Sequence, residues 1–126
     1  MRSILIITAA LFVTGCMGSG RSAERQTSGD LTAAALMATD APDMYMAIQS
    51  LRPIWLGSRG PTSASDPTPT HANVAVNGAI AGDIGHLRNL RIQDVQSARL
   101  LSPGQASARY GMGHPRGVIE IILRRQ

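Results

Sequence analysis

Few side chains in this sequence have types and spacings that could carry out a reaction. The three histidines show no His-x-x-x-His spacing and no carboxylates at the intervals of metal ligands; they are His71, His86 and His114. The eight acidic residues are isolated along the chain, so no pair for general acid/base catalysis can be assigned. The glycine-rich stretch 104–113 lacks the lysine and the spacing of a phosphate-binding loop. We therefore expect a protein that is not an enzyme and that uses no metal or cofactor.

The one cysteine, Cys16, follows a short apolar run that indicates export. Arg2 precedes an apolar run at residues 4–13, which is too short to span a bilayer. Residues 13–16 read Val-Thr-Gly-Cys, which resembles the lipobox of bacterial lipoproteins. This resemblance implies cleavage before Cys16 and a lipid on its side chain. An ordinary secretory signal cleaved near Gly18 is the alternative. A single cysteine also excludes an internal disulfide.

Composition divides the chain into a signal peptide at 1–15, a polar tether at 16–29 and one domain at 30–126. Within the domain, residues 57–72 are rich in Gly, Ser, Thr and Pro and are predicted to form a disordered loop. The arginines are scattered and not interleaved with aromatic residues, so we expect no nucleic-acid partner. They indicate a solvated surface with some attraction to anionic headgroups.

The first half of the domain predicts two helices and a hairpin. A short helix covers 33–37, and a stronger one begins at residues 40–43, which read Asp-Ala-Pro-Asp. The stronger helix carries an apolar stripe at helical spacing, formed by Met44, Ala47, Ile48 and Leu51. Trp55 follows and is interpreted as an anchor on the core, with an exposed binding role as the alternative. Asn77-Gly78 predicts a tight turn between a strand at 73–76 and a return strand of two or three residues.

The last third of the chain predicts strand, helix, strand. Apolar and polar residues alternate before residue 102, and Ser102-Pro103 followed by Gln105 is typical of a capped helix start. Gly111 is predicted to end this helix in a left-handed conformation. Residues 118–123 are almost wholly apolar, as in a strand covered on both faces. We expect a βαβ unit with parallel strands.

Four segments in this order resemble the plug domain of TonB-dependent outer-membrane receptors: residues 74–78, 92–101, 106–111 and 117–122. Residues 31–51 are similar to the pair of short helices that precedes the sheet in that family. The resemblance covers about residues 30–124 and is most specific in the last third. It implies an α+β domain with a small mixed β-sheet, a βαβ unit and short helices.

The chain also departs from that family. A β-barrel of about twenty-two strands follows the plug of a receptor, whereas this sequence ends shortly after the last predicted strand, so we expect no transport by this chain alone. Gln96 and Arg99 stand where the family has acidic residues, Ser102 stands for a glycine, and no convincing TonB box precedes the domain. The resemblance therefore implies the fold, and function does not follow from fold alone.

We expect a lipid-anchored envelope protein, in the outer membrane and facing the periplasm, that acts as a binding or accessory module. The candidate contacts with an envelope partner, a β-barrel or a periplasmic protein, lie in two loops and comprise Asn77, Gly78, Gly111, Gly113, His114 and Gly117. One alternative is a small-ligand or oligosaccharide-binding lipoprotein that stacks its ligand on Trp55, Tyr45 and Tyr110. Another is a passive structural lipoprotein.

Overall fold

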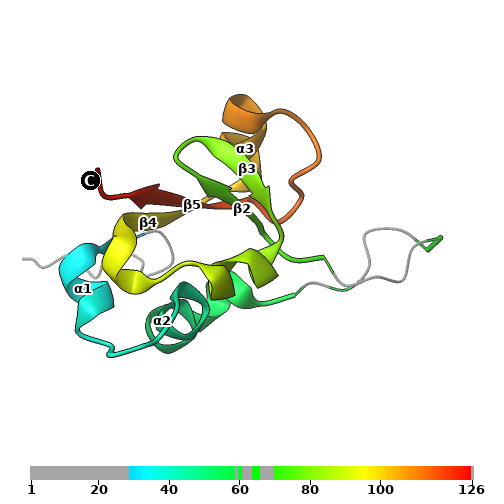
Figure 1. Ribbon diagram of the computed structural model, residues 1–126. Helices are drawn as coiled ribbons and strands as arrows, with labels where there is room; N and C mark the ends of the chain where they lie inside the picture. Colours follow the sequence, from blue (N-terminus) through cyan, green and yellow to red (C-terminus); the bar gives the residue numbers. More distant parts are fainter. Residues whose placement is uncertain (1–28, 59, 61–63, 66–69, 126) are drawn as a thin grey trace, which may run out of the picture.

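The computed structural model describes residues 29–58, 60, 64–65 and 70–125. The predicted signal peptide, Cys16 and the tether up to residue 28 lie outside them. The described chain forms a five-stranded mixed sheet in the order β1-β4-β5-β2-β3. Helices α1 (Ala33–Met37) and α2 (Met44–Leu51) lie on one face of this sheet, and α3 (Pro103–Tyr110) lies on the other (Figure 1). The expected small mixed sheet with short helices is confirmed.

The N-terminal helices begin at side-chain caps. The Thr32 hydroxyl accepts from the backbone N–H of Ala35, and Asp43 accepts from that of Met46 at 2.9 Å. The second helix therefore starts later than the residue 40–43 motif predicted. Asp40, the expected cap, adopts a φ of 49°, whereas Asp43 has the extended conformation that is typical of an N-cap residue.

The predicted apolar stripe on α2 is confirmed, because three of its four members are fully buried and Leu51 packs against them. The layer beneath the sheet is completed by the 3₁₀ helices η1 (Pro53–Leu56), η2 (Ile84–Asn89) and η3 (Ile92–Asp94). Trp55 is 1 % exposed, so its predicted role as a core anchor is also confirmed. The largest buried side chains of this core are Trp55, Leu36, Met44, Ile48, Leu87, Ile119 and Ile121.

The predicted hairpin forms between β2 (Asn73–Val76) and β3 (Ala79–Gly82). Asn77 and Gly78 have φ of 50° and 86°, and positive φ at both central residues is the requirement of a type I′ turn. The return strand runs one residue further than expected and ends at Gly82, which has a φ of 151°.

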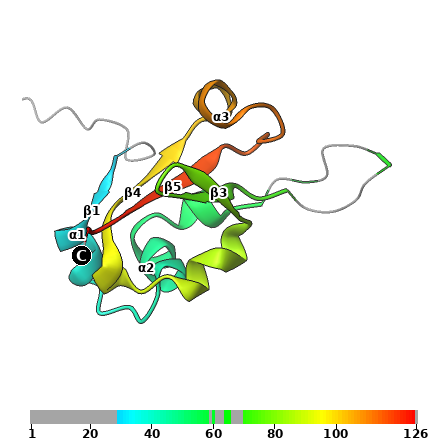
Figure 2. The ribbon, with the colours of Figure 1, turned by 45° about the horizontal axis from the view of Figure 1, so that its top comes forward.

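The predicted parallel βαβ unit is wrong. Strand β4 (Val95–Leu101) pairs antiparallel with β5 (Val118–Leu123), with Leu101 opposite Val118, and the parallel partner of β5 is β2. The eight residues of α3 rise only about 12 Å, whereas the seven residues of β4 span about 23 Å. The loop at 111–117 then leads the chain back to the end of β4, so β5 runs in the opposite direction (Figure 2).

The predicted start and end of α3 are confirmed, although the predicted pairing of the strands on either side of it is not. Ser102 and Gln105 form a reciprocal capping box, and Gly111 ends the helix with a φ of 85°. Strand β5 is covered on both faces, since its first four residues are buried.

Part of the segment that was predicted as a disordered loop, 57–72, lies outside the described residues. The end of this segment is attached to the domain: Ala72 belongs to the core, and Nδ1 of His71 lies 3.4 Å from the carbonyl oxygen of Leu56.

No helix within the described part of the chain is long and apolar enough to cross a membrane.

Candidate functional site

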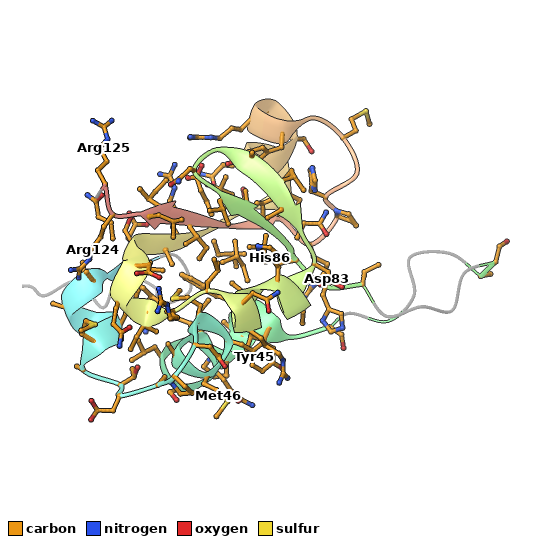
Figure 3. The ribbon with its side chains drawn as sticks, viewed as in Figure 1. Tyr45, Met46, Asp83, His86, Arg124 and Arg125 are labelled. Atoms are coloured by element: carbon orange, nitrogen blue, oxygen red, sulfur yellow. The ribbon has the colours of Figure 1, made fainter. Side chains whose placement is uncertain are left out.

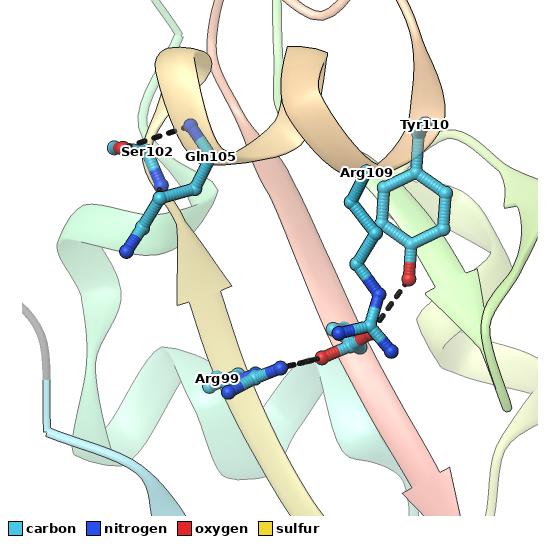
Figure 4. A network of polar contacts seen from close by, with 6 residues as sticks. Arg99, Ser102, Gln105, Arg109 and Tyr110 are labelled. Carbon is cyan, nitrogen blue, oxygen red and sulfur yellow. Dashed lines mark hydrogen bonds and ion pairs between the residues drawn. The ribbon is translucent and has the colours of Figure 1, made fainter.

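A buried carboxylate lies on the α3 face of the sheet. Glu120 is 1 % exposed and accepts hydrogen bonds from Arg99 Nε at 2.7 Å and from the Tyr110 hydroxyl at 2.6 Å. Arg109 forms an ion pair at 3.0 Å with Glu120 Oε1, the same carboxylate oxygen that accepts from Tyr110, while Arg99 binds Oε2. Figure 4 shows Arg99, Arg109 and Tyr110 converging on this point. We call these four residues the Glu120 cluster.

Sheet register and helix placement bring the cluster together. Arg99 and Glu120 are directly opposite in the antiparallel β4–β5 pair, so their side chains lie on the same face. Arg109 and Tyr110 occupy the last turn of α3, which packs on this face through Ala106. The cluster therefore attaches the C-terminal end of α3 to the middle of the sheet.

The environment of Glu120 favours its charged form. Burial by itself raises the pKa of this carboxyl, but hydrogen bonds from Tyr110 and Arg99 and the charges of Arg99 and Arg109 outweigh burial and lower the pKa. Burial, the hydrogen bond to Glu120 and its negative charge raise the pKa of the Tyr110 phenol. A carboxylate that stays ionised, accepts hydrogen bonds from two side chains and forms an ion pair with a third is suited to holding structure and to balancing charge, not to proton transfer near neutral pH.

No pattern in the sequence predicted the Glu120 cluster. Glu120 was treated as one member of an apolar strand, although a carboxylate in a buried strand must find partners. That signal was present in the sequence. The identity of the partners was not, because Arg99 becomes the cross-strand neighbour of Glu120 only in the antiparallel register.

Beside the cluster, two adjoining hollows are lined by arginines. The smaller, of about 260 Å³, lies between Arg99, Arg109 and Asp30. The larger, of about 800 Å³, shares Arg109 with it and extends to Arg124 and Arg125 at the end of the chain. Figure 3 shows Arg125 extending away from the ribbon beyond β5. We call Arg99, Arg109, Arg124 and Arg125 the arginine surface.

The structure places the two predicted contact loops apart. Asn77 and Gly78 line the larger hollow, and Asn77 Oδ1 accepts from the backbone N–H of Leu123 at 2.9 Å. Gly111, Gly113, His114 and Gly117 belong to the loop between α3 and β5. The base of that loop lies at the other end of β2, where the side chains of His114 and Asn73 are 2.7 Å apart. The four residues of β2 separate the two loop bases by about 13 Å.

The remaining candidate side chains do not gather into a site. The three histidines lie in different segments, and among the described residues no group of three or more His, Cys, Asp and Glu could hold a metal ion. Trp55 is buried and offers no stacking surface. The Arg88 guanidinium lies over the Tyr45 ring, 4.2 Å from its centroid, and therefore covers that face of the ring. The Tyr110 hydroxyl donates to Glu120.

Comparison with known proteins identifies no relative: no family model, no curated protein and no solved structure matches this chain. What is established is a small mixed α/β domain with a buried glutamate cluster and an adjoining arginine surface.

Proposed function

We propose that this protein is a lipid-anchored accessory module of the bacterial envelope, with a plug-like domain that binds a partner. The order of the described elements supports the plug-like interpretation. The elements follow one another in the order that the resemblance implies: two short helices, an Asn-Gly hairpin, a strand, a helix that ends at Tyr110-Gly111, and a last apolar strand. In the proposal, Cys16 carries the lipid and the domain faces the periplasm from the outer membrane.

The observation that carries the binding role is an exposed apolar side chain on a fixed loop. Met112 is 94 % exposed at the tip of the 111–117 loop. The base of this loop is held by Gly117, whose N–H donates to the His114 carbonyl at 2.9 Å and whose carbonyl accepts from Asn73. A flexible, polarisable methionine on a well-positioned loop is suited to contact with a protein partner.

Site-specific photo-crosslinking in envelope extracts tests the binding role. We expect a photoreactive residue at Met112, or at Ala79 beside the hairpin turn, to capture a specific envelope protein. The same residue at Gln49, which is exposed on α2 on the opposite face, is the matched control. Equal labelling from all three positions, or capture of lipoprotein-sorting factors alone, would count against a dedicated partner.

The anchor is tested separately. Cys16→Ser should abolish metabolic labelling with lipid and leave the precursor uncleaved by the lipoprotein peptidase. Normal maturation of this variant would exclude the lipobox interpretation and would favour the ordinary secretory signal.

A further inference from the structure

We propose that the arginine surface docks the domain onto anionic phospholipid headgroups of the membrane that holds the anchor. This inference rests on the proposed lipid anchor and adds a second, electrostatic contact with the same membrane. One lipid chain combined with a basic patch is one of the pairs of signals that give stable membrane attachment.

The charge on this surface exceeds what the Glu120 cluster neutralises. Arg99 and Arg109 are both bound to Glu120, yet they remain 42 % and 49 % exposed. Arg124 and Arg125 add two exposed guanidinium groups around the larger hollow. Among the residues that line the two hollows, Glu120 and Asp30 are the only acidic ones. Asp94 lines a neighbouring hollow with Arg124 and Arg125, but it is paired with Arg91 at 3.1 Å, so two positive charges remain in excess.

The point at which the chain enters the domain lies on the same face. Asp30 lines the smaller hollow together with Arg99 and Arg109, and β1 (Leu31–Thr32) pairs with β4 immediately afterwards. The chain between Cys16 and Gly29 reaches at most about 45 Å when fully extended. A lipid on Cys16 would therefore keep the point of entry at Asp30, and the arginines beside it, within about 45 Å of the bilayer surface.

Guanidinium groups suit the proposed occupant. Their planar forks bind phosphate oxygens bidentately and lose less hydration than an ammonium group. The Arg124 side chain is positioned by its Nε–H, which donates to the Val95 carbonyl at 3.2 Å. Arg125 extends from the end of the chain into solvent (Figure 3). Each arginine close to an anionic membrane strengthens binding roughly fivefold.

The test is co-sedimentation of the full chain with vesicles. The chain carries Cys16→Ser so that no lipid contributes, and vesicles of phosphatidylcholine alone are compared with vesicles that also contain phosphatidylglycerol. The apolar run at residues 4–13 contributes to both measurements, so the readout is the ratio of the two affinities. We expect a preference for the anionic vesicles that raised salt suppresses.

Two single variants locate that preference. Arg125→Gln should reduce the ratio about fivefold. Arg88→Gln removes the same formal charge from an exposed residue that lines neither hollow, and it should change the ratio less than about twofold. Neither variant touches the Glu120 cluster.

Three results would overturn the proposal: equal affinity for both kinds of vesicle, equal effects of the two single variants, or binding to soluble polyglutamate without binding to anionic vesicles. The last would assign the surface to an acidic protein. Normal lipid labelling of the wild-type chain together with any of these would reject the docking surface and leave the anchor intact. Absent labelling would instead reject the anchor.

Discussion

Replacing the buried carboxylate tests what holds α3 on the sheet. In Glu120→Gln the side chain keeps its shape but loses its charge, and its new amide N–H groups face donors from Arg99, Arg109 and Tyr110. A hydrogen bond to a charged group contributes about 1.5–3 kcal/mol. Both arginines are more than 40 % exposed and can turn towards water, so their contacts contribute only a small part of this free energy. We expect the free energy of unfolding to fall by about 2 kcal/mol, which lowers Tm by about 8–16 °C in a domain of this size.

The assay is thermal unfolding followed by circular dichroism from neutral to acid pH. Because the folded-state pKa of Glu120 is lowered, its contribution is fully present above the unfolded value of about 4.5 and is lost as the pH falls through the folded value. The difference between wild type and Glu120→Gln should therefore be largest near neutral pH and should shrink below about pH 4.5.

Asp94→Asn is the matched control. Asp94 forms an ion pair with Arg91 at 3.1 Å, but the two side chains are 41 % and 72 % exposed. A pair of this kind contributes about 0–1 kcal/mol. If Glu120→Gln were no more destabilising than Asp94→Asn, or if its effect did not depend on acid pH, the assignment of the cluster as a structural attachment would be refuted.

Three further substitutions test separate features by the same unfolding measurement. Tyr110→Phe should lower the free energy of unfolding by about 1.5–3 kcal/mol near neutral pH. Burial and the bound carboxylate raise the pKa of the Tyr110 phenol, so its contribution is present below about pH 10 and is lost as the pH rises further. If Tyr110→Phe lost stability at alkaline pH as steeply as the wild type, this reasoning would be contradicted. Gly117→Ala should lower the free energy of unfolding by about 2–5 kcal/mol, because Gly117 has a φ of 82° and a Cβ there would overlap the carbonyl oxygen of Leu101 at the end of β4. Gly113→Ala is the control: it also has a positive φ but nothing lies near its Cβ, so it should cost only about 1–2 kcal/mol. Ile121→Asp should prevent folding, while Ile80→Asp, 43 % exposed on the edge strand, should fold.

Features encoded within a few consecutive residues could be predicted from the sequence. The type I′ turn at Asn77-Gly78 depends on the φ preferences of two residues, and the capping box at Ser102 depends on a side chain three positions away. Burial of the α2 stripe follows from helical periodicity. Each of these predictions needed no knowledge of distant segments.

Features that depend on how distant segments pair could not be predicted. Strand, helix, strand is compatible with parallel or antiparallel pairing, and only the length of α3 and the return path of the 111–117 loop select the antiparallel register. That register places Arg99 opposite Glu120. The start of α2 was also displaced, because Asp40 and Asp43 are both acceptable caps and the turn at Asp40 left only Asp43 available.

Short stretches of the sequence encode the local elements and their apolar faces, and they predict a lipid anchor at Cys16. The pairing of distant strands, by contrast, surrounds a glutamate within an apolar strand with two arginines and a tyrosine. The same folded arrangement brings arginines that are scattered along the chain onto one surface around two adjoining hollows. Local preferences act over a few residues, whereas the partners of a buried charge and the electrostatic field of a surface depend on which distant residues the register brings within a few ångströms of each other.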